Sequence, residues 1–316
     1  MPKLEANFLT VLRDHTAGDP MREGVRWTHL TLREIADRLA RTTTPVSVTV
    51  VKQLLKKHRY VKRKARKSQS MGHHPDRNAQ FENIAEIKRE YETLGNPIVS
   101  MDTKKKELLG NFRREGRLYT QAPLQTFDHD FRSSARGVVI PHGLYDVTRN
   151  CGHVNLGVSH DTSAFACDSI YHWWQRHGRA AWPDATSLLL LCDGGGSNSA
   201  SQYLFKQDLQ KLVDKIGITI RVAHYPPYAS KYNPIEHRLF PHLTRACEGV
   251  IFHSVELVKD LMKRTKTQTG LRVTVNIIKK MYETGRKVSD GFRDHMQILF
   301  DKYLSKWNYR AVPTPS

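Results

Sequence analysis

A short apolar segment that ends in an acid constrains the fold of this chain more than any other feature. Residues 188–192 form its longest unbroken apolar run, and Asp193 follows directly, before three glycines. A strand that is apolar on both faces is typical of the centre of a sheet covered by helices on each side. The run is far shorter than the roughly 20 residues of a membrane-spanning helix. We therefore expect a buried α/β sheet.

From residue 97 onward, the pattern alternates between strand and helix periods. Strands are predicted over residues 98–102, 138–147, 153–159, 187–193 and 218–224. Helices are predicted over residues 162–177, 199–216, 255–265, 273–284 and 290–306. A further helix over residues 81–94 follows a linker-like polar stretch.

Near the N-terminus, residues 31–58 are predicted to form two short amphipathic helices joined by a turn. Ser47 is the expected N-cap of the second helix. Apolar residues at helical spacing predict one buried face on each helix, formed by Leu32, Ile35, Ala36, Leu39, Val48, Val51, Leu54 and Leu55. The spacing is typical of a helix-turn-helix motif, whose second helix lies in the major groove of DNA. The alternative is a helical hairpin packed on the larger domain, with a solvated basic tail.

Positive charge indicates a polyanionic partner. Fifty Lys and Arg against thirty-one Asp and Glu give a formal net charge of +19, which favours binding to nucleic acid. The outward face of the second helix and the basic arm after it carry the predicted DNA contacts, which are Lys52, Gln53, Lys56, Arg59, Lys62, Arg63, Lys64, Arg66 and Lys67.

Three acids occupy positions that suit metal-dependent chemistry. Asp102 and Asp193 end predicted strands, where a sheet presents side chains to a crevice. Glu236 follows Asn233 and Pro234, an expected N-cap and first helical residue, so its carboxylate falls in the first turn of a helix. Each acid taken alone is explained equally well without catalysis: Glu236 as part of a capping interaction, Asp102 and Asp193 as ordinary strand-end or turn residues.

Phosphodiester chemistry supplies a reason for several acids to meet. Two metal ions about 3.5–4 Å apart activate the attacking oxygen and stabilise the leaving oxygen. Mg²⁺ and Mn²⁺ prefer carboxylate ligands, so two such ions are the expected cofactors.

Three strings, in the order in which they occur, resemble one family. They are MDTKKKE from residue 101, LCDGGGSN from residue 191 and HYPPYASKYNPIEHR from residue 224. The last resembles the segment around the final acid of DDE-type transposases of mariner-like and related bacterial insertion-sequence groups. The first two are similar to the ISAzo-thirteen-like group. KWNY, from residue 306, resembles the C-terminal end of that family.

The resemblance implies an RNase H-like mixed sheet flanked by helices, in which Asp102, Asp193 and Glu236 are the catalytic and metal-binding acids. It implies cleavage of element ends and joining of the 3′-hydroxyl ends to target DNA. The implied partner is double-stranded DNA, bound by a homodimer or larger assembly on paired ends. Family members usually have Trp in place of Tyr232 and begin further upstream, so we expect an N-terminal segment to be missing here. Pro241 is expected to kink or shorten the helix that carries Glu236.

Cations beside the acids form a second set of predicted DNA contacts. Lys104, Lys105 and Arg238 neighbour the acids, where they either hold the phosphates that flank the cut or form a solvated charge run. His237 is expected to pack against its surroundings, because adjacent helical positions point in different directions. Trp173 and Trp174 are interpreted as core residues rather than as a base-stacking platform.

These patterns predict four parts: a helix-turn-helix domain with its basic arm (1–67), a linker and connecting helix (68–96), an RNase H-like catalytic domain (97–253) and a helical C-terminal part of that domain (254–316). The four cysteines stand far apart and are interpreted as reduced packing residues. Without a secretory or membrane segment, a cytoplasmic location is expected. Two alternatives stay open: a catalytically inactive DNA-binding regulator and a nuclease of the same fold that never joins strands.

Overall fold

The structure is a computed structural model that describes residues 2–18, 26–63, 74–195, 199 and 201–315. The chain forms two compact units, Met1–Gln69 and Ser70–Ser316, and each is described by itself. All four cysteines are buried and free, as predicted. Among the described residues, no helix combines the length and the apolar character that crossing a membrane requires.

The first unit contains three helices and a small hairpin. They are α1 (Pro2–Arg13), β1 (Thr16–Gly18), β2 (Arg26–Thr28), α2 (Leu32–Arg41) and α3 (Val48–Lys57). The two predicted helices are confirmed as α2 and α3. Ser47 caps α3, since its Oγ accepts the backbone N–H of Val50. Thr31 and Glu34 form a capping box on α2, with hydrogen bonds of 2.7 and 3.2 Å.

The core of this unit includes a helix that the sequence patterns did not single out. Phe8 of α1 is fully buried against Ile35, Leu39 and Val51. The prediction that Leu32 and Val48 are buried is wrong, since they are 38% and 46% exposed. Both are the first residue of their helix and lie beyond the small core that α1 covers.

The second unit is built on a mixed sheet. Its strands are β3 (Ile98–Thr103), β4 (Glu107–Leu109), β5 (Gly137–Asp146), β6 (Cys151–Gly157), β7 (Ser187–Cys192), β8 (Thr219–His224), β9 (Arg272–Ile278), β10 (Ile298–Phe300) and β11 (Asn308–Ala311). Their order is β10-β11-β8-β7-β3-β5-β6-β9, with β4 paired to β5. β3, β7 and β8 run parallel, and β5 is antiparallel to both β3 and β6. This central arrangement is the RNase H-like mixed sheet that was expected.

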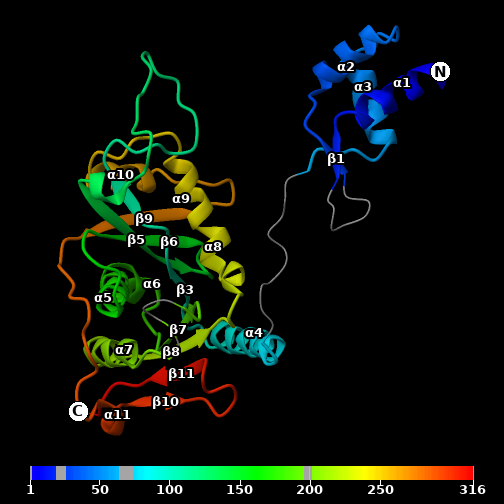
Figure 1. Cartoon of the computed structure of the whole chain (residues 1–316). Helices are drawn as coiled ribbons and strands as arrows, with labels where there is room; N and C mark the ends of the chain where they lie inside the picture. The colour runs from blue at the N-terminus through cyan, green and yellow to red at the C-terminus, as the bar shows by residue number, and fades with distance from the viewer. Residues whose placement is uncertain (1, 19–25, 64–73, 196–198, 200, 316) are drawn as a thin grey trace. The chain divides into compact units, whose positions relative to one another are not determined.

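Helices cover both faces of this sheet (Figure 1). α5 (Ser163–Trp173) and α7 (Tyr203–Ile216) pack on one face, over the core formed by Met101, Leu190 and Val222. The opposite face carries α4 (Arg77–Thr93), α8 (Pro234–Arg238), α9 (Phe240–Ala246) and α10 (Val255–Lys263). Shorter turns are η1 (Arg132–Ser134), the π-helical η2 (Trp174–Gly178), α6 (Arg179–Ala181), η4 (Ser230–Tyr232) and α11 (Phe292–His295).

Several predictions about this unit are confirmed. Trp173 and Trp174 are core residues, 2% and 4% exposed. The helix after Asn233 is interrupted at Leu239, and Pro241 lies in the first turn of the next helix, as its missing N–H requires. His237 is exposed, so the expectation that it packs is wrong.

The expected helical C-terminal part is wrong in two of its three segments. α10 forms, but residues 272–278 are β9, which pairs in parallel with β6 at the edge of the sheet. The run RVTVNII is rich in β-branched side chains, which favour strands. Residues 290–306 hold only the short α11 and β10, and β10 continues the sheet through β11.

Candidate active site

Two of the predicted acids end neighbouring strands. Asp102 lies in β3, and Asp193 directly follows β7. These strands pair in parallel with Met101 opposite Cys192, so the two aspartates occupy equivalent positions. Neighbouring strands lie about 4.8 Å apart, and equivalent positions point to the same face. The sheet therefore brings Asp102 and Asp193 side by side.

Glu236 reaches the same place on α8, which packs against β3 and β5. Ile235 is fully buried, and its backbone N–H donates to Ser100 Oγ at 2.9 Å. Gly143 of β5 pairs with Asp102 of β3. A Cβ atom on Gly143 would lie 2.7 Å from the Phe240 ring and 2.8 Å from the Ile235 side chain. Glycine at this position thus lets the helix approach the strand that carries Asp102.

Asn233 locks these elements together. Its amide oxygen accepts a hydrogen bond from Ser100 Oγ at 2.5 Å, and its amide nitrogen donates to Met101 O and to Asp193 Oδ1 at 3.1 Å each. The side chain is fully buried. Asn233 does stand at the N-cap position, but the predicted side-chain cap is wrong, because the amide is used between β3 and Asp193 instead.

Glu236 also makes no capping box, since no side-chain hydrogen bond caps α8 in the described structure. Its carboxyl group is hydrogen-bonded to that of Asp102. The structural alternative for Glu236, a role in helix capping, therefore loses its support. The carboxylate points to the other acids.

The three carboxyl groups influence one another's ionisation. Burial, the charge of Asp193 and a hydrogen bond to Glu236 raise the pKa of Asp102 to about 8. Burial raises the pKa of Asp193 to about 6; the Asn233 amide opposes this and Glu236 adds to it. A hydrogen bond between two carboxyl groups needs a proton on one of them, and the pKa of Asp102 makes it the group that holds the proton.

This donor set fits a divalent cation by its chemistry. The main influences on the pKa of Asp102 and of Asp193 include no cationic side chain. Within the described ranges, however, no three His, Cys, Asp or Glu side chains are close enough to form a ready-made metal site. The raised pKa values and the lack of a ready-made metal site have the same physical cause, because carboxylates without a cation between them repel one another and retain a proton.

The backbone of Asp193 is held by His224 of β8, which in turn contacts Tyr309 of β11. His224 is fully buried, and its Nδ1–H donates to the Asp193 carbonyl at 2.9 Å, while the Tyr309 hydroxyl lies 3.3 Å from Nε2. Burial lowers the pKa of His224 to about 4, so the ring is neutral and has one acceptor nitrogen for the hydroxyl. His224 and Tyr309 are site-positioning residues that sequence analysis missed, although both lie within the family strings.

The cations beside the acids differ in their surroundings. Lys104 donates to Glu107 at 2.6 Å in a largely buried ion pair, whereas Lys105 and Arg238 are exposed. Only the latter two have a solvated head group available for DNA.

In the first unit, Lys52, Gln53 and Lys56 are exposed on α3, and Arg59, Lys62 and Arg63 are exposed after it. Lys64, Arg66 and Lys67 lie outside the described residues.

Comparison with known proteins decides the family. A sequence model described as the Rhodopirellula transposase DDE domain matches residues 7–313. The chain belongs to this transposase family. It is therefore a DNA transposase and an enzyme of the DDE class, and the match spans both units of this transposase. Among curated proteins, no match is found.

Solved structures of Mos1 transposase resemble the transposase chain at low identity. The "Mos1 transposase paired-end complex with left transposon end" is 16% identical with a TM-score of 0.44, covering 81% of this chain and 68% of that one. The "pre-cleavage Mos1 transpososome" is 15% identical with a TM-score of 0.44, covering 81% and 69%. The "Mos1 mariner paired end complex with Mn" is 14% identical with a TM-score of 0.43, covering 81% and 69%.

Proposed function

We propose that this transposase cleaves the ends of an insertion sequence and joins the freed 3′-hydroxyl ends to target DNA, with Asp102, Asp193 and Glu236 as its catalytic residues. The observation that supports the proposal is the proximity of these three carboxyl groups, from β3, the end of β7 and α8, with no cationic partner among the described residues. A chain with a net charge of +19 has many cations that could have neutralised them.

Asp102, Asp193 and Glu236 would hold two Mg²⁺ or Mn²⁺ ions. When bound, such a pair supplies activation of the attacking water or 3′-hydroxyl and stabilisation of the leaving oxygen. Asn233 fixes one oxygen of Asp193, and His224 fixes its backbone, so this acid is held in place before substrate arrives. The shared proton at Asp102 must leave before all three groups can act as ligands.

The exposed α3 face and the segment after it are proposed to bind the element ends. Lys52 and Lys56 would contact phosphates, and Gln53 would read a base edge in the major groove. Gln53→Ala is expected to weaken binding to the element end by about 1–3 kcal/mol, with little change for unrelated duplex DNA. Equal losses for both duplexes in a mobility-shift assay would contradict this role.

The test of the whole proposal is a strand-transfer assay with duplexes that carry the element ends. Asp102→Asn, Asp193→Asn and Glu236→Gln should abolish Mg²⁺-dependent cleavage and joining while DNA affinity is retained. Glu248→Gln, which removes an exposed acid after α9, is the matched control and should keep both activities.

Other outcomes separate the alternatives. An amide variant that still cuts would contradict the assignment of the three acids. Wild-type protein that cleaves but never joins pre-nicked ends would be a nuclease of this fold. Specific binding without cleavage would identify an inactive regulator.

A further inference from the structure

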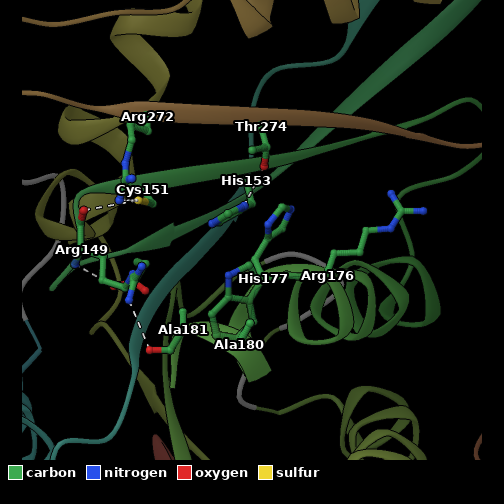
Figure 2. Close-up of a pocket in the computed structure, with 11 residues that line it drawn as sticks. Arg149, Cys151, His153, Arg176, His177, Ala180, Ala181, Arg272 and Thr274 are labelled. Carbon is green, nitrogen blue, oxygen red and sulfur yellow. Dashed lines mark hydrogen bonds between the residues drawn. The ribbon is translucent and has the colours of Figure 1, made fainter. Parts of the chain in front are cut away.

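A cavity of about 350 Å³ lies on the sheet face opposite the three acids. This volume is at the lower end of the range of small-ligand pockets, about 300–1,000 Å³. Figure 2 shows residues of β6, β9, the turn before β6 and the helical segment after α5 around it. The residues that decide its chemistry are Arg149, Cys151, His153, His177, Arg272 and Thr274.

Two arginines in this cavity form no ion pair with a carboxylate of the described residues, although Asp146 is close enough to Arg149 for their charges to attract. Arg149 donates to the Ala181 carbonyl at 3.2 Å, and Arg272 donates to Cys151 Sγ at 3.4 Å. Within the described part of the chain, neither forms an ion pair with a carboxylate. A guanidinium group has five N–H donors, so each keeps most of its hydrogen-bonding capacity.

The one acid that lines the cavity is already engaged. Asp146 accepts the backbone N–H of Arg149 at 2.9 Å and the indole N–H of Trp182 at 3.0 Å. Figure 2 shows the side chains of Arg149 and Arg272 close to Cys151, one on each side, whereas the Arg176 guanidinium points away from them. Arg176 bonds Asn276 instead, at 2.7 Å.

The floor of the cavity is neutral and polar. His153 Nδ1 lies 2.7 Å from Thr274 Oγ1, and its ring lies 4.5 Å from that of His177. Burial, His177, Arg149 and Arg272 lower the pKa of His153 to about 3, so the ring stays uncharged. The positive charge of the cavity therefore comes from the arginines, and the imidazole and hydroxyl groups offer further hydrogen bonds.

The helical wall is irregular at this point. η2 is a π-helical turn that directly continues α5, and it carries Arg176 and His177. Such turns are rare in proteins, and those that occur often lie at functional sites. Ala180 and Ala181 complete the wall with small side chains, which leaves room for a ligand beside His177.

We propose that this cavity binds a phosphate group through the guanidinium groups of Arg149 and Arg272. Paired guanidinium groups match the geometry of phosphate oxygens and form charge-assisted hydrogen bonds with them. The source that best fits a chain of this charge is the backbone of DNA, and this choice of source rests on the proposed function. The proposal that the cavity binds phosphate is independent of the proposed function.

This phosphate is not the one that is cut. Asp102 shares a cross-strand row with Gly143 and Val154, whereas His153 is the next residue along β6 and points to the other face. Along β3, Asp102 is three residues from Val99, the partner of Asp146, which is about 10 Å of strand. The cavity would therefore hold DNA away from the reacting bond.

The test compares two double variants that each remove two cations. Arg149→Gln/Arg272→Gln removes the two guanidinium groups beside Cys151, and Lys263→Gln/Arg264→Gln, at the end of α10 on the opposite face, is the matched control. Affinity for an element-end duplex is measured at several salt concentrations. A plot of the logarithm of the binding constant against the logarithm of the salt concentration has a negative slope. The cavity variant should make this slope less negative by about 1–2, and the control should keep the wild-type slope. An equal change for both would overturn the DNA assignment, because lost charge alone would explain it.

A second arm uses inorganic phosphate as the probe. Phosphate, compared with chloride at equal ionic strength, should raise the melting temperature of the wild type and of the control, but not that of the cavity variant. A response to phosphate without a change in DNA slope would identify a free anion as the ligand, and no response in either arm would overturn the proposal. A protein that passes the phosphate arm but cleaves no DNA would refute the proposed function and leave this site standing.

Discussion

Removal of one of the three proposed catalytic acids is expected to stabilise the metal-free protein. Asp102 holds a pKa of about 8 in the folded chain, against an ordinary value of 3.8. The raised folded-state pKa means that the folded form binds the proton more tightly than the unfolded form. Asp102 therefore costs stability at every pH above about 4, because only the unfolded form ionises there, and the cost grows until the pH reaches about 8.

The size of this cost follows from the two pKa values. A difference of about four pH units corresponds to at most about 5–6 kcal/mol at pH 8. Burial causes most of this shift, and the neighbouring Asp193 and Glu236 share the rest and titrate together with Asp102, so we expect about 2–3 kcal/mol for Asp102 alone. Asp102→Asn keeps a donor for Glu236 and removes the ionisable group. In a domain of this size the gain should raise the melting temperature by about 5–10 °C.

The assay is thermal unfolding in the presence of a chelator at pH values from 4 to 8. The increase in melting temperature from Asp102→Asn should be near zero at pH 4 and largest at pH 8. Added Mg²⁺ should stabilise only the wild type, so that the wild type then melts at the higher temperature. Asp260→Asn, which removes an exposed acid on α10, should show no such gain. A variant that melts at or below the wild type at pH 8, or a gain that does not vary with pH, would refute the convergence of the three carboxyl groups.

Three further outcomes test how the site is held. Asn233→Ala should lower the free energy of unfolding by about 3–5 kcal/mol, because it removes three buried hydrogen bonds, one of them to a carboxylate; denaturant unfolding would measure this, and a loss below about 1 kcal/mol would contradict it. Tyr309→Phe should cost about 1 kcal/mol and slow cleavage without weakening DNA binding, and unchanged cleavage kinetics would argue against a positioning role. Gly143→Ala should cost about 1–3 kcal/mol, because its methyl group would meet Phe240 and Ile235, and an unchanged melting temperature would show that α8 is free to shift.

Local patterns in the sequence were sufficient for the centre of the fold. The apolar run that ends at Asp193 predicted the central strand, and it forms β7 between β3 and β8. The period of a strand was harder to recognise at the edge. β9 is only partly buried and shows no clean alternation, so all of it except Arg272 was interpreted as helix. Its pairing with β6, about 120 residues earlier, was not visible in any local window.

The same limit explains what was missed in the site. Asp102, Asp193 and Glu236 were found because each stands in a string that resembles a family. Asn233 was assigned a local role as a cap, whereas its partners are Ser100, Met101 and Asp193, far away in the chain. Contacts of this kind depend on the packing of α8 on β3, and no spacing rule contains them.

Elsewhere in the fold, buried acids are compensated either by cations or, as for Asp146, by two N–H donors, and this makes the three uncompensated acids informative. Glu107, with a side chain 12% exposed, is paired with a lysine and an arginine, and Asp208, 6% exposed, is paired with an arginine. Removing a carboxylate from water is costly unless a cation compensates for it. Asp102, Asp193 and Glu236 are partly buried beside one another, and within the described ranges none has such a partner. In a chain with nineteen surplus positive charges, this arrangement leaves three neighbouring acids without a compensating cation. A structural role would not require it, whereas a site that receives its positive charge from bound ions does.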